Sequence, residues 1–209
     1  MNRRNTVATV LLAASVMGGL AACSSHSDEA AGGGAATATA AGSASDVAFA
    51  QSMIPHHQQA VEMADLALDP KSDASPQVKA LAKQIKAAQD PEIQQMSTWL
   101  AQWGASSAMP SASGDGGDMA GMDHGGHDMG GITMSGMMTA EEVAELSGAS
   151  GKEFDTLWLQ MMIAHHEGAV QMAEQVKAGS GNPEVTALAD SVIAGQTQEI
   201  ETMQNLLAA

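Results

Sequence analysis

The sequence predicts an all-α protein, an antiparallel four-helix bundle built from two copies of one helical hairpin. Residues 46–67 align without a gap on residues 155–176 with 10 identities in 22 positions, and residues 76–100 align on residues 183–207 with 11 in 25. Apolar residues in all four segments recur at steps of three and four, the spacing of one helical face. No strand-like alternation interrupts them. Two such hairpins packed together give the predicted bundle.

The first 45 residues have the features of an export signal followed by a spacer. Two arginines precede an apolar run, residues 7–20, that is too short to span a membrane as a helix. We interpret residues 1–22 as a lipoprotein signal peptide, because Cys23, the only cysteine, directly follows small residues typical of a lipobox. We expect Cys23 to be lipidated; the alternative is an incidental free thiol. Residues 23–45 would then be a flexible spacer on an outward-facing membrane surface.

The net charge of the chain is strongly negative, −16 at neutral pH. Removal of residues 1–22 takes away two of the eight basic residues and none of the 24 acidic ones, which leaves −18. This balance argues against nucleic acid as a partner. It either raises the local concentration of cations or only keeps an exported chain soluble.

The first hairpin is expected over residues 46–103. One face of its first helix carries Phe49, Met53, His56, Ala60, Met63 and Ala67. The second helix begins at Pro76, where proline suits a first turn. Its corresponding face carries Leu81, Ile85, Gln89, Glu92, Met96 and Trp99. Pro55 removes one backbone hydrogen bond and is expected to bend the first helix beside the histidines.

Residues 104–138 are predicted to form a disordered linker between the hairpins. They contain ten glycines, seven methionines, four aspartates and two histidines, with no lysine, arginine or glutamate. Such a composition cannot build a packed core, and a flexible linker has no packing reason to use methionine. Either the methionines are incidental or the linker binds metal. The candidate ligands in it are Met119, Met122, His124, His127 and Met129.

The second repeat is expected over residues 139–209 and begins with a short extra helix. Thr139 and Glu142 have capping-box spacing, and Gly148 can end that helix. The two long helices that follow copy the first hairpin, with Pro183 at the start of the last one. Their inner faces carry Trp158, Met162, His165, Ala169, Met172 and Val176, then Leu188, Val192, Gln196, Glu199, Met203 and Leu206. Ala164 replaces Pro55, so the two copies need not be equivalent.

Both hairpins place a methionine three residues before a pair of histidines. Residues three or four apart lie on one helical face, so Met53 can join His56 or His57 in binding a metal ion. Adjacent histidines point about 100° apart, and we expect the first of each pair to face the interior. The second copy of this arrangement consists of Met162, His165 and His166.

The ligand types indicate which metal would bind. Di-iron bundles use Glu-x-x-His, whereas this chain has Met-x-x-His. Replacing a carboxylate by a thioether shifts the preference away from iron or manganese towards copper, especially Cu(I), with zinc as a second candidate. A buried carboxylate must be paired, so we expect Glu92 and Glu199 each to accept a hydrogen bond from a histidine or to bind the metal. The supporting or additional ligands would come from Gln89, Glu92, Met96, Gln196, Glu199 and Met203.

The motif Asp-x-x-Phe-x-x-x-Met-Ile-Pro-His-His and its copy, followed by Gln-x-x-Glu-Ile-x-x-Met, resembles that of the DUF305 family. The resemblance covers residues 46–103 and 139–209. It implies a ferritin-like helical bundle, often exported, with some members linked to copper binding or tolerance, and it supplies no established reaction. Trp158 in place of phenylalanine and Ala164 in place of proline are the departures. The family's histidine-methionine motif maps onto Met53, His56, His57, Met63, Met162, His165, His166 and Met172.

The sequence therefore predicts a lipid-anchored, extracytoplasmic protein that captures or buffers copper. One alternative is a structural or interaction bundle whose histidines only make internal hydrogen bonds. Another is a redox protein with copper or non-covalent haem, although the chain has only five aromatic residues and no Cys-x-x-Cys-His. A Gly-x-Ser-x-Gly elbow, a Walker loop and a His-Glu-x-x-His helix are absent, so we favour a binding protein over an enzyme. The sequence indicates no particular protein partner.

Overall fold

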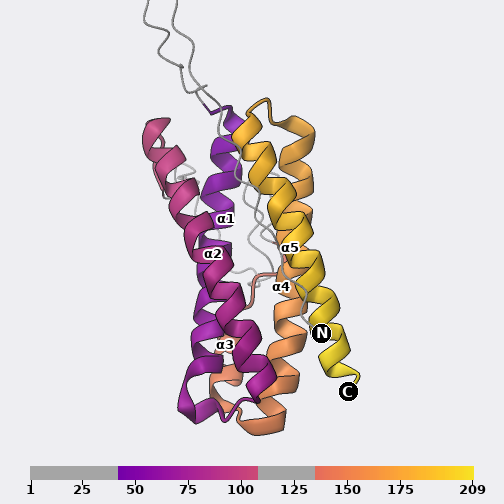
Figure 1. Ribbon diagram of the computed structural model, residues 1–209. Coiled ribbons are helices and arrows are strands. Elements are labelled where there is room, and N and C mark those ends of the chain that lie inside the picture. The colour runs from indigo at the N-terminus through magenta and orange to yellow at the C-terminus, as the bar shows by residue number, and fades with distance from the viewer. Residues whose placement is uncertain (1–41, 108–134) are drawn as a thin grey trace, which may run out of the picture. The chain divides into compact units, whose positions relative to one another are not determined.

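The computed structural model describes residues 42–107 and 135–209, and within these ranges the chain has five α-helices and no strand (Figure 1). The prediction of an all-α protein is confirmed for this part of the chain. The helices are α1 (Ala44–Leu68), α2 (Pro76–Gln102), α3 (Ala140–Gly148), α4 (Gly151–Gly179) and α5 (Pro183–Leu207), with a 3-10 turn, η1 (Pro70–Ser72), between α1 and α2.

Several predicted features lie outside the described residues. These are the signal peptide, the lipidation site Cys23 and most of the spacer. The candidate linker ligands Met119, Met122, His124, His127 and Met129 lie outside them as well.

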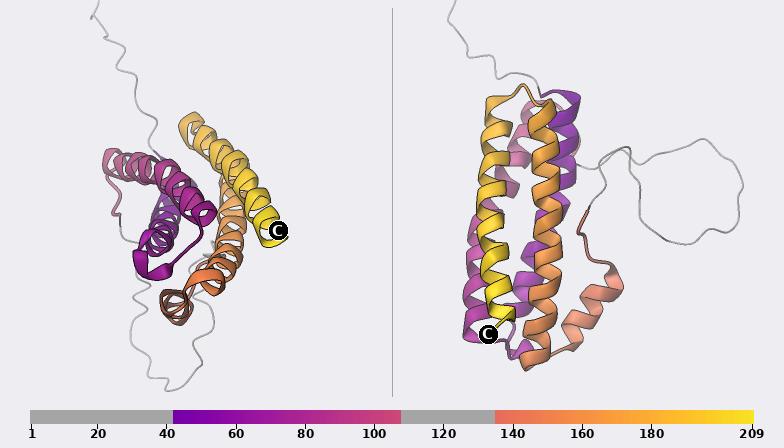
Figure 2. Two further views of the ribbon diagram at one scale, coloured as in Figure 1. Left: turned by 60° about the horizontal axis from the view of Figure 1, so that its bottom comes forward. Right: turned by 90° about the vertical axis from the view of Figure 1, so that its right-hand side faces the viewer.

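The long helices form two hairpins that meet through α1 and α4. Helix α1 packs along α2, α4 packs along α5, and α1 lies against α4 (Figures 1 and 2). A buried hydrogen bond joins the hairpins, because Nε1 of Trp158 donates to the carbonyl oxygen of Met63 at 2.8 Å. The two helices that carry the histidine pairs are therefore in direct contact.

The starts of the helices follow from their capping residues. Helix α1 begins with a capping box in which the Ser43 side chain accepts from the Asp46 amide and the Asp46 side chain accepts from the Ser43 amide. Pro76 occupies the first turn of α2 as the sequence predicts. The predicted extra helix is also present as α3, which starts with the Thr139 and Glu142 capping box. It packs against α4.

Proline interrupts both helices of the first hairpin and neither helix of the second. Pro55 lies inside α1 beside the histidines, as expected, and Pro91 lies inside α2 directly before Glu92. The equivalent residues are Ala164 in α4 and Gln198 in α5. Each proline removes one helical hydrogen bond, so the backbone beside the motif residues differs between the repeats.

The buried apolar side chains form two clusters, and each draws on both hairpins. The Phe49 core contains Phe49, Met53, Met96, Trp99 and Met172, among others. The Trp158 core contains Met63, Phe154, Trp158, Met162 and Met203, among others. Along α1 and along α4, the histidine pairs come between the residues of one core and those of the other. The histidines therefore form a polar layer between two apolar cores.

Candidate metal centre

The four motif histidines are all completely buried. The side chains of His56, His57, His165 and His166 have a relative exposure of 0%. Helix periodicity accounts for this placement, because each pair is flanked one turn away on both sides by core residues of the same helix. Burial of four polar rings in one layer is costly unless hydrogen bonds or a ligand satisfy their nitrogens.

The first histidine of each pair faces its counterpart across the contact between α1 and α4. The ring centroids of His56 and His165 are 3.8 Å apart, with an angle of 42° between the ring planes. The sequence predicted that these two histidines would face the interior. Their contact brings the two repeats together at equivalent positions.

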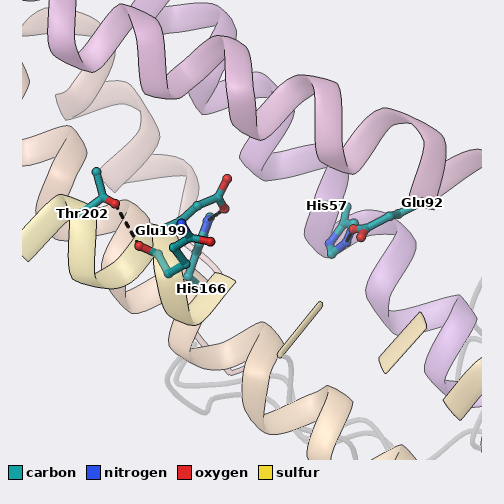
Figure 3. Close-up of polar contacts among 6 residues, drawn as sticks. His57, Glu92, His166, Glu199 and Thr202 are labelled. Carbon is teal, nitrogen blue, oxygen red and sulfur yellow. Dashed lines mark hydrogen bonds and ion pairs between the residues drawn. The ribbon is translucent and has the colours of Figure 1, made fainter. Parts of the chain in front are cut away.

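The second histidine of each pair is bound to a glutamate of its own hairpin. His57 Nε2 donates to Glu92 Oε2 at 2.7 Å, and His166 Nε2 donates to Glu199 Oε2 at 2.8 Å (Figure 3). The glutamate side chains are only 17% and 19% exposed. The expectation that each glutamate accepts a hydrogen bond from a histidine ring is confirmed.

His56 has a different partner, the main chain of residue 135. Its Nε2 lies 3.1 Å from the carbonyl oxygen of Ser135. A carbonyl can only accept, so the proton is on Nε2 of His56. The same reasoning applies to His57 and His166, whose acceptors are carboxylates. In the neutral form of these three rings, Nδ1 therefore carries the lone pair.

The Nδ1 atoms of all four histidines are buried without a hydrogen-bond partner, and so is Nε2 of His165. A buried polar atom left unpaired costs about 1–3 kcal/mol. In their neutral form the four rings each have one unpaired nitrogen that carries a lone pair, and these four nitrogens are candidate metal ligands. This is the chemical feature that distinguishes the layer from an ordinary hydrogen-bonded core.

Burial keeps the inner histidine pair neutral. Desolvation lowers the pKa of His56 from 6.5 to about 3, against the opposing effect of the Ser135 hydrogen bond. Desolvation, followed by the neighbouring His56, His166 and His57, also lowers the pKa of His165 well below 6.5, against the opposing effect of the His56 backbone. Neutral imidazole is the form that binds metal, so protons do not compete for these rings near neutral pH.

The candidate methionine ligands lie on both sides of the histidine layer. Met53 and Met172 belong to the Phe49 core, whereas Met63 and Met162 belong to the Trp158 core, and none is more than 2% exposed. Met96 joins the first pair and Met203 the second. In the alignment of the two repeats, Met53 corresponds to Met162, Met63 to Met172 and Met96 to Met203. The three methionines in one core therefore correspond to the three in the other core.

Two glutamines add further unsatisfied polar atoms. Gln89 and Gln196 occupy equivalent positions and are 2% and 4% exposed. Both polar side-chain atoms of Gln89 and the Oε1 atom of Gln196 have no hydrogen-bond partner. Each lies one turn before the glutamate that binds a histidine, so the polar character of the layer extends along α2 and α5.

A family model described as "Domain of unknown function (DUF305)" matches residues 46–207. The chain belongs to the DUF305 family. The match takes in all four long helices, α3 and the histidine layer.

Three solved structures show the extent of the likeness to other DUF305 proteins. A DUF305 fragment from Deinococcus radiodurans is 29% identical, with a TM-score of 0.65 and coverage of 80% of this chain and 97% of the other. A DUF305 protein of Streptomyces coelicolor, described as secreted, is 30% identical, with a TM-score of 0.66 and coverage of 78% and 92%. CopM in its Cu(II)-bound form is 32% identical, with a TM-score of 0.57 and coverage of 78% and 95%. A comparison with curated proteins gives no significant match.

The described side chains of this DUF305 protein do not form a conventional carboxylate and histidine site. Within residues 42–107 and 135–209, no group of three or more His, Cys, Asp or Glu residues is arranged to hold a metal ion. Both glutamates nearest the histidines are engaged with Nε2 atoms. The candidate ligands that remain are the unpaired imidazole nitrogens and the methionine sulfurs of the motif.

Two residues beside the histidines were not identified from the sequence. Ser135 was assigned to the linker, yet its carbonyl oxygen binds His56. Gln59 was not singled out, although its side chain binds the backbone of Met138. Gln59 aligns with Gly168 in the second repeat. This difference between two otherwise similar helices is the feature of the sequence that could have identified Gln59.

The helices of residues 42–107 and 135–209 give no evidence of a membrane span, because none combines the required length and apolar character.

Proposed function

We propose that this DUF305 protein is a membrane-anchored, extracytoplasmic copper-binding protein that captures or buffers copper, with Cu(I) favoured, in a ferritin-like four-helix bundle. One observation carries the proposal: four fully buried histidines present Nδ1 atoms that have no hydrogen-bond partner. The similarity to CopM, which has been solved in Cu(II)-bound, Cu(I)-bound and Ag-bound forms, supports the choice of metal.

The donor set fits a soft monovalent ion. Neutral imidazole and thioether groups favour Cu(I), whereas hard cations prefer carboxylate oxygen. Zinc, which imidazole and carboxylate suit, is the second candidate metal. The proposed ligands are drawn from Met53, His56, His57, Met63, Met162, His165, His166 and Met172.

The glutamates have a supporting role in this proposal. Glu92 and Glu199 accept the Nε2 protons of His57 and His166, which fixes the ring orientation and makes Nδ1 a more basic ligand. Met96 and Met203 lie in the two cores, and Gln89 and Gln196 carry unpaired polar atoms. These four residues are candidates for supporting or additional ligands.

Residues outside the helices would anchor the protein at a membrane and supply metal to the histidine layer. Lipidation at Cys23 would hold the protein on an outward-facing membrane surface, and the net charge of −18 that remains without residues 1–22 would concentrate cations near it. The residues Met119, Met122, His124, His127 and Met129 would act as a loading arm for the buried centre.

An anaerobic Cu(I) titration against a competing chelator tests the proposal. The proteins compared are the chain beginning at Ser24 and the same chain without residues 114–134. Tight binding that survives the deletion supports a centre among the histidines, whereas binding lost on deletion would assign it to residues 114–134. Failure of both proteins to compete for Cu(I) would refute the proposed function.

A structural role for the histidines is the second candidate function, favoured by the two histidine–glutamate hydrogen bonds. Alanine at His56 and His165 would then lower the thermal stability without changing the metal content of protein purified from its host. A decrease in metal content would favour the copper-binding function.

A further inference from the structure

A short segment before α3 packs across the histidine layer, and we call residues 135–138 the strap. At one end, the Ser135 carbonyl accepts the proton of His56 Nε2 at 3.1 Å. At the other end, the Gln59 side chain binds both backbone groups of Met138: Met138 N donates to Oε1 at 2.7 Å, and Nε2 donates to Met138 O at 2.8 Å. The strap leads directly into α3, which lies beside α4 (Figure 2).

Two glycines allow the strap to approach α4 this closely. A Cβ atom on Gly168 would lie 1.8 Å from the Ser135 carbonyl oxygen, and a Cβ atom on Gly136 would lie 2.4 Å from the Ala164 carbonyl oxygen. Gly136 also has a φ of +81°, a conformation that other residues rarely adopt. The position of the Ser135 carbonyl is therefore defined by backbone contacts on the α4 side and by Gln59 on the α1 side.

The strap makes the two repeats unequal. Gln59 and Gly168 occupy equivalent positions in the two repeats. The glutamine in α1 anchors the strap, whereas the glycine in α4 leaves space for it. His56 gains a hydrogen bond from this arrangement, whereas neither ring nitrogen of the equivalent His165 has a partner. Only one of the two inner histidines has its protonated nitrogen fixed by the strap.

We propose that Gln59 is a positioning residue for His56: by anchoring the strap, it holds the Ser135 carbonyl on Nε2 and leaves Nδ1 of His56 as the metal-binding nitrogen. The part of this inference that concerns metal rests on the proposed copper function. The part that concerns the ring proton does not, because it is a property of the metal-free protein.

The ring proton can be located by long-range ¹H–¹⁵N NMR of metal-free protein labelled at histidine, at neutral pH. In the wild type we expect His56 to carry its proton on Nε2. In Gln59→Ala we expect loss of that fixed tautomer at His56, with the signals of His57 and His166 unchanged. Gln58→Ala, the exposed neighbouring glutamine, is the matched control and should match the wild type.

Gly168→Ala tests the same contact from the other helix. The added methyl group meets backbone atoms of Ser135, so the strap must move, and the His56 tautomer should change as in Gln59→Ala. Alanine also favours the helical state of α4 by up to about 1 kcal/mol relative to glycine, so folding is not expected to fail. A wild-type His56 protonated on Nδ1, or a tautomer unaffected in both variants, would overturn the inference.

A Cu(I) competition titration of the same proteins tests the ligand assignment. Removing a group that orients a metal-binding histidine weakens binding by about 10- to 100-fold, and we expect this for Gln59→Ala but not for Gln58→Ala. A changed tautomer with unchanged Cu(I) affinity would overturn the assignment of Nδ1 of His56 as a ligand. Absence of Cu(I) binding in the wild type would refute the proposed function, while the tautomer measurement would still decide the role of Gln59.

Discussion

His56 and His165 occupy the same position in the two repeats, and their completely buried rings lie 3.8 Å apart between centroids. Burial lowers the pKa of both rings, so they meet as neutral imidazoles. Neutral rings in contact avoid the repulsion that two imidazolium ions would have at this distance. Protonation of both rings would therefore weaken this contact between the repeats.

The stability of the protein should fall with pH below about 6.5. The unfolded chain protonates both histidines there, whereas the folded protein keeps His56 neutral down to a pKa of about 3. Since the unfolded state binds more protons in this window, the free energy of unfolding decreases as pH falls, by up to about 1.4 kcal/mol per pH unit for each histidine. Urea unfolding between pH 7.5 and 5 measures the slope.

The control for this slope is the double variant His56→Gln, His165→Gln. Its stability should vary less between pH 7.5 and 5, because the two depressed pKa values have been removed. Equal slopes in the wild type and the double variant would mean that other groups cause the pH dependence.

Loss of the Glu199 acceptor should destabilise the second hairpin. Glu199→Leu leaves the buried Nε2–H of His166 without its partner at 2.8 Å, which costs about 1–3 kcal/mol. Glu199→Gln retains an acceptor oxygen and should cost less. Urea unfolding at pH 7.5 gives the comparison, with Glu201→Leu as the control because Glu201 is exposed on the same helix. If Glu199→Gln lowers the stability as much as Glu199→Leu does, the hydrogen bond to Glu199 is not the cause of the loss.

The sequence predicted the parts of the centre that depend on helix periodicity. The four-residue and three-residue steps place His56 and Glu92 on the inner faces of their helices, and the cost of burying a carboxylate led us to expect a hydrogen bond from a histidine. That histidine is His57, which the steps alone did not identify. The extra helix was predictable from the capping box of Thr139 and Glu142 because a cap is a local interaction. Pro91 does not end α2, because the helical pattern continues on both sides of it.

The strap could not be predicted because it depends on a close approach between distant parts of the chain. Ser135 and Gly136 sit at the end of a glycine-rich segment, and nothing local distinguishes them from the residues before them. Their position is decided by contacts with α4 and with Gln59. The division of the methionines between two cores has a similar origin, because it follows from how α1 and α4 align.

Replacement of the motif methionines by leucine should separate metal binding from packing. Met53 and Met162 are fully buried, and leucine conserves their volume, so we expect a stability loss below about 1.5 kcal/mol for each. The thioether is removed, so Cu(I) affinity should fall. Met161→Leu is the control, since Met161 adjoins Met162 but lies outside the repeated motif. Unchanged affinity in Met53→Leu and Met162→Leu would show that these methionines only pack.

Silver ions should stabilise the folded protein through the histidine layer. Ag(I) is a soft monovalent ion like Cu(I), so the unpartnered Nδ1 atoms of the buried histidines should bind it in the folded state. A ligand that binds only the folded state adds about 2.7 kcal/mol when its free concentration is 100 times the Kd. Thermal unfolding of the chain beginning at Ser24, which lacks the Cys23 thiol, measures the gain. The double variant His56→Gln, His165→Gln should lose this gain, whereas Met161→Leu should keep it. An equal rise in Tm in the double variant would mean that silver binds elsewhere and that His56 and His165 are not its ligands.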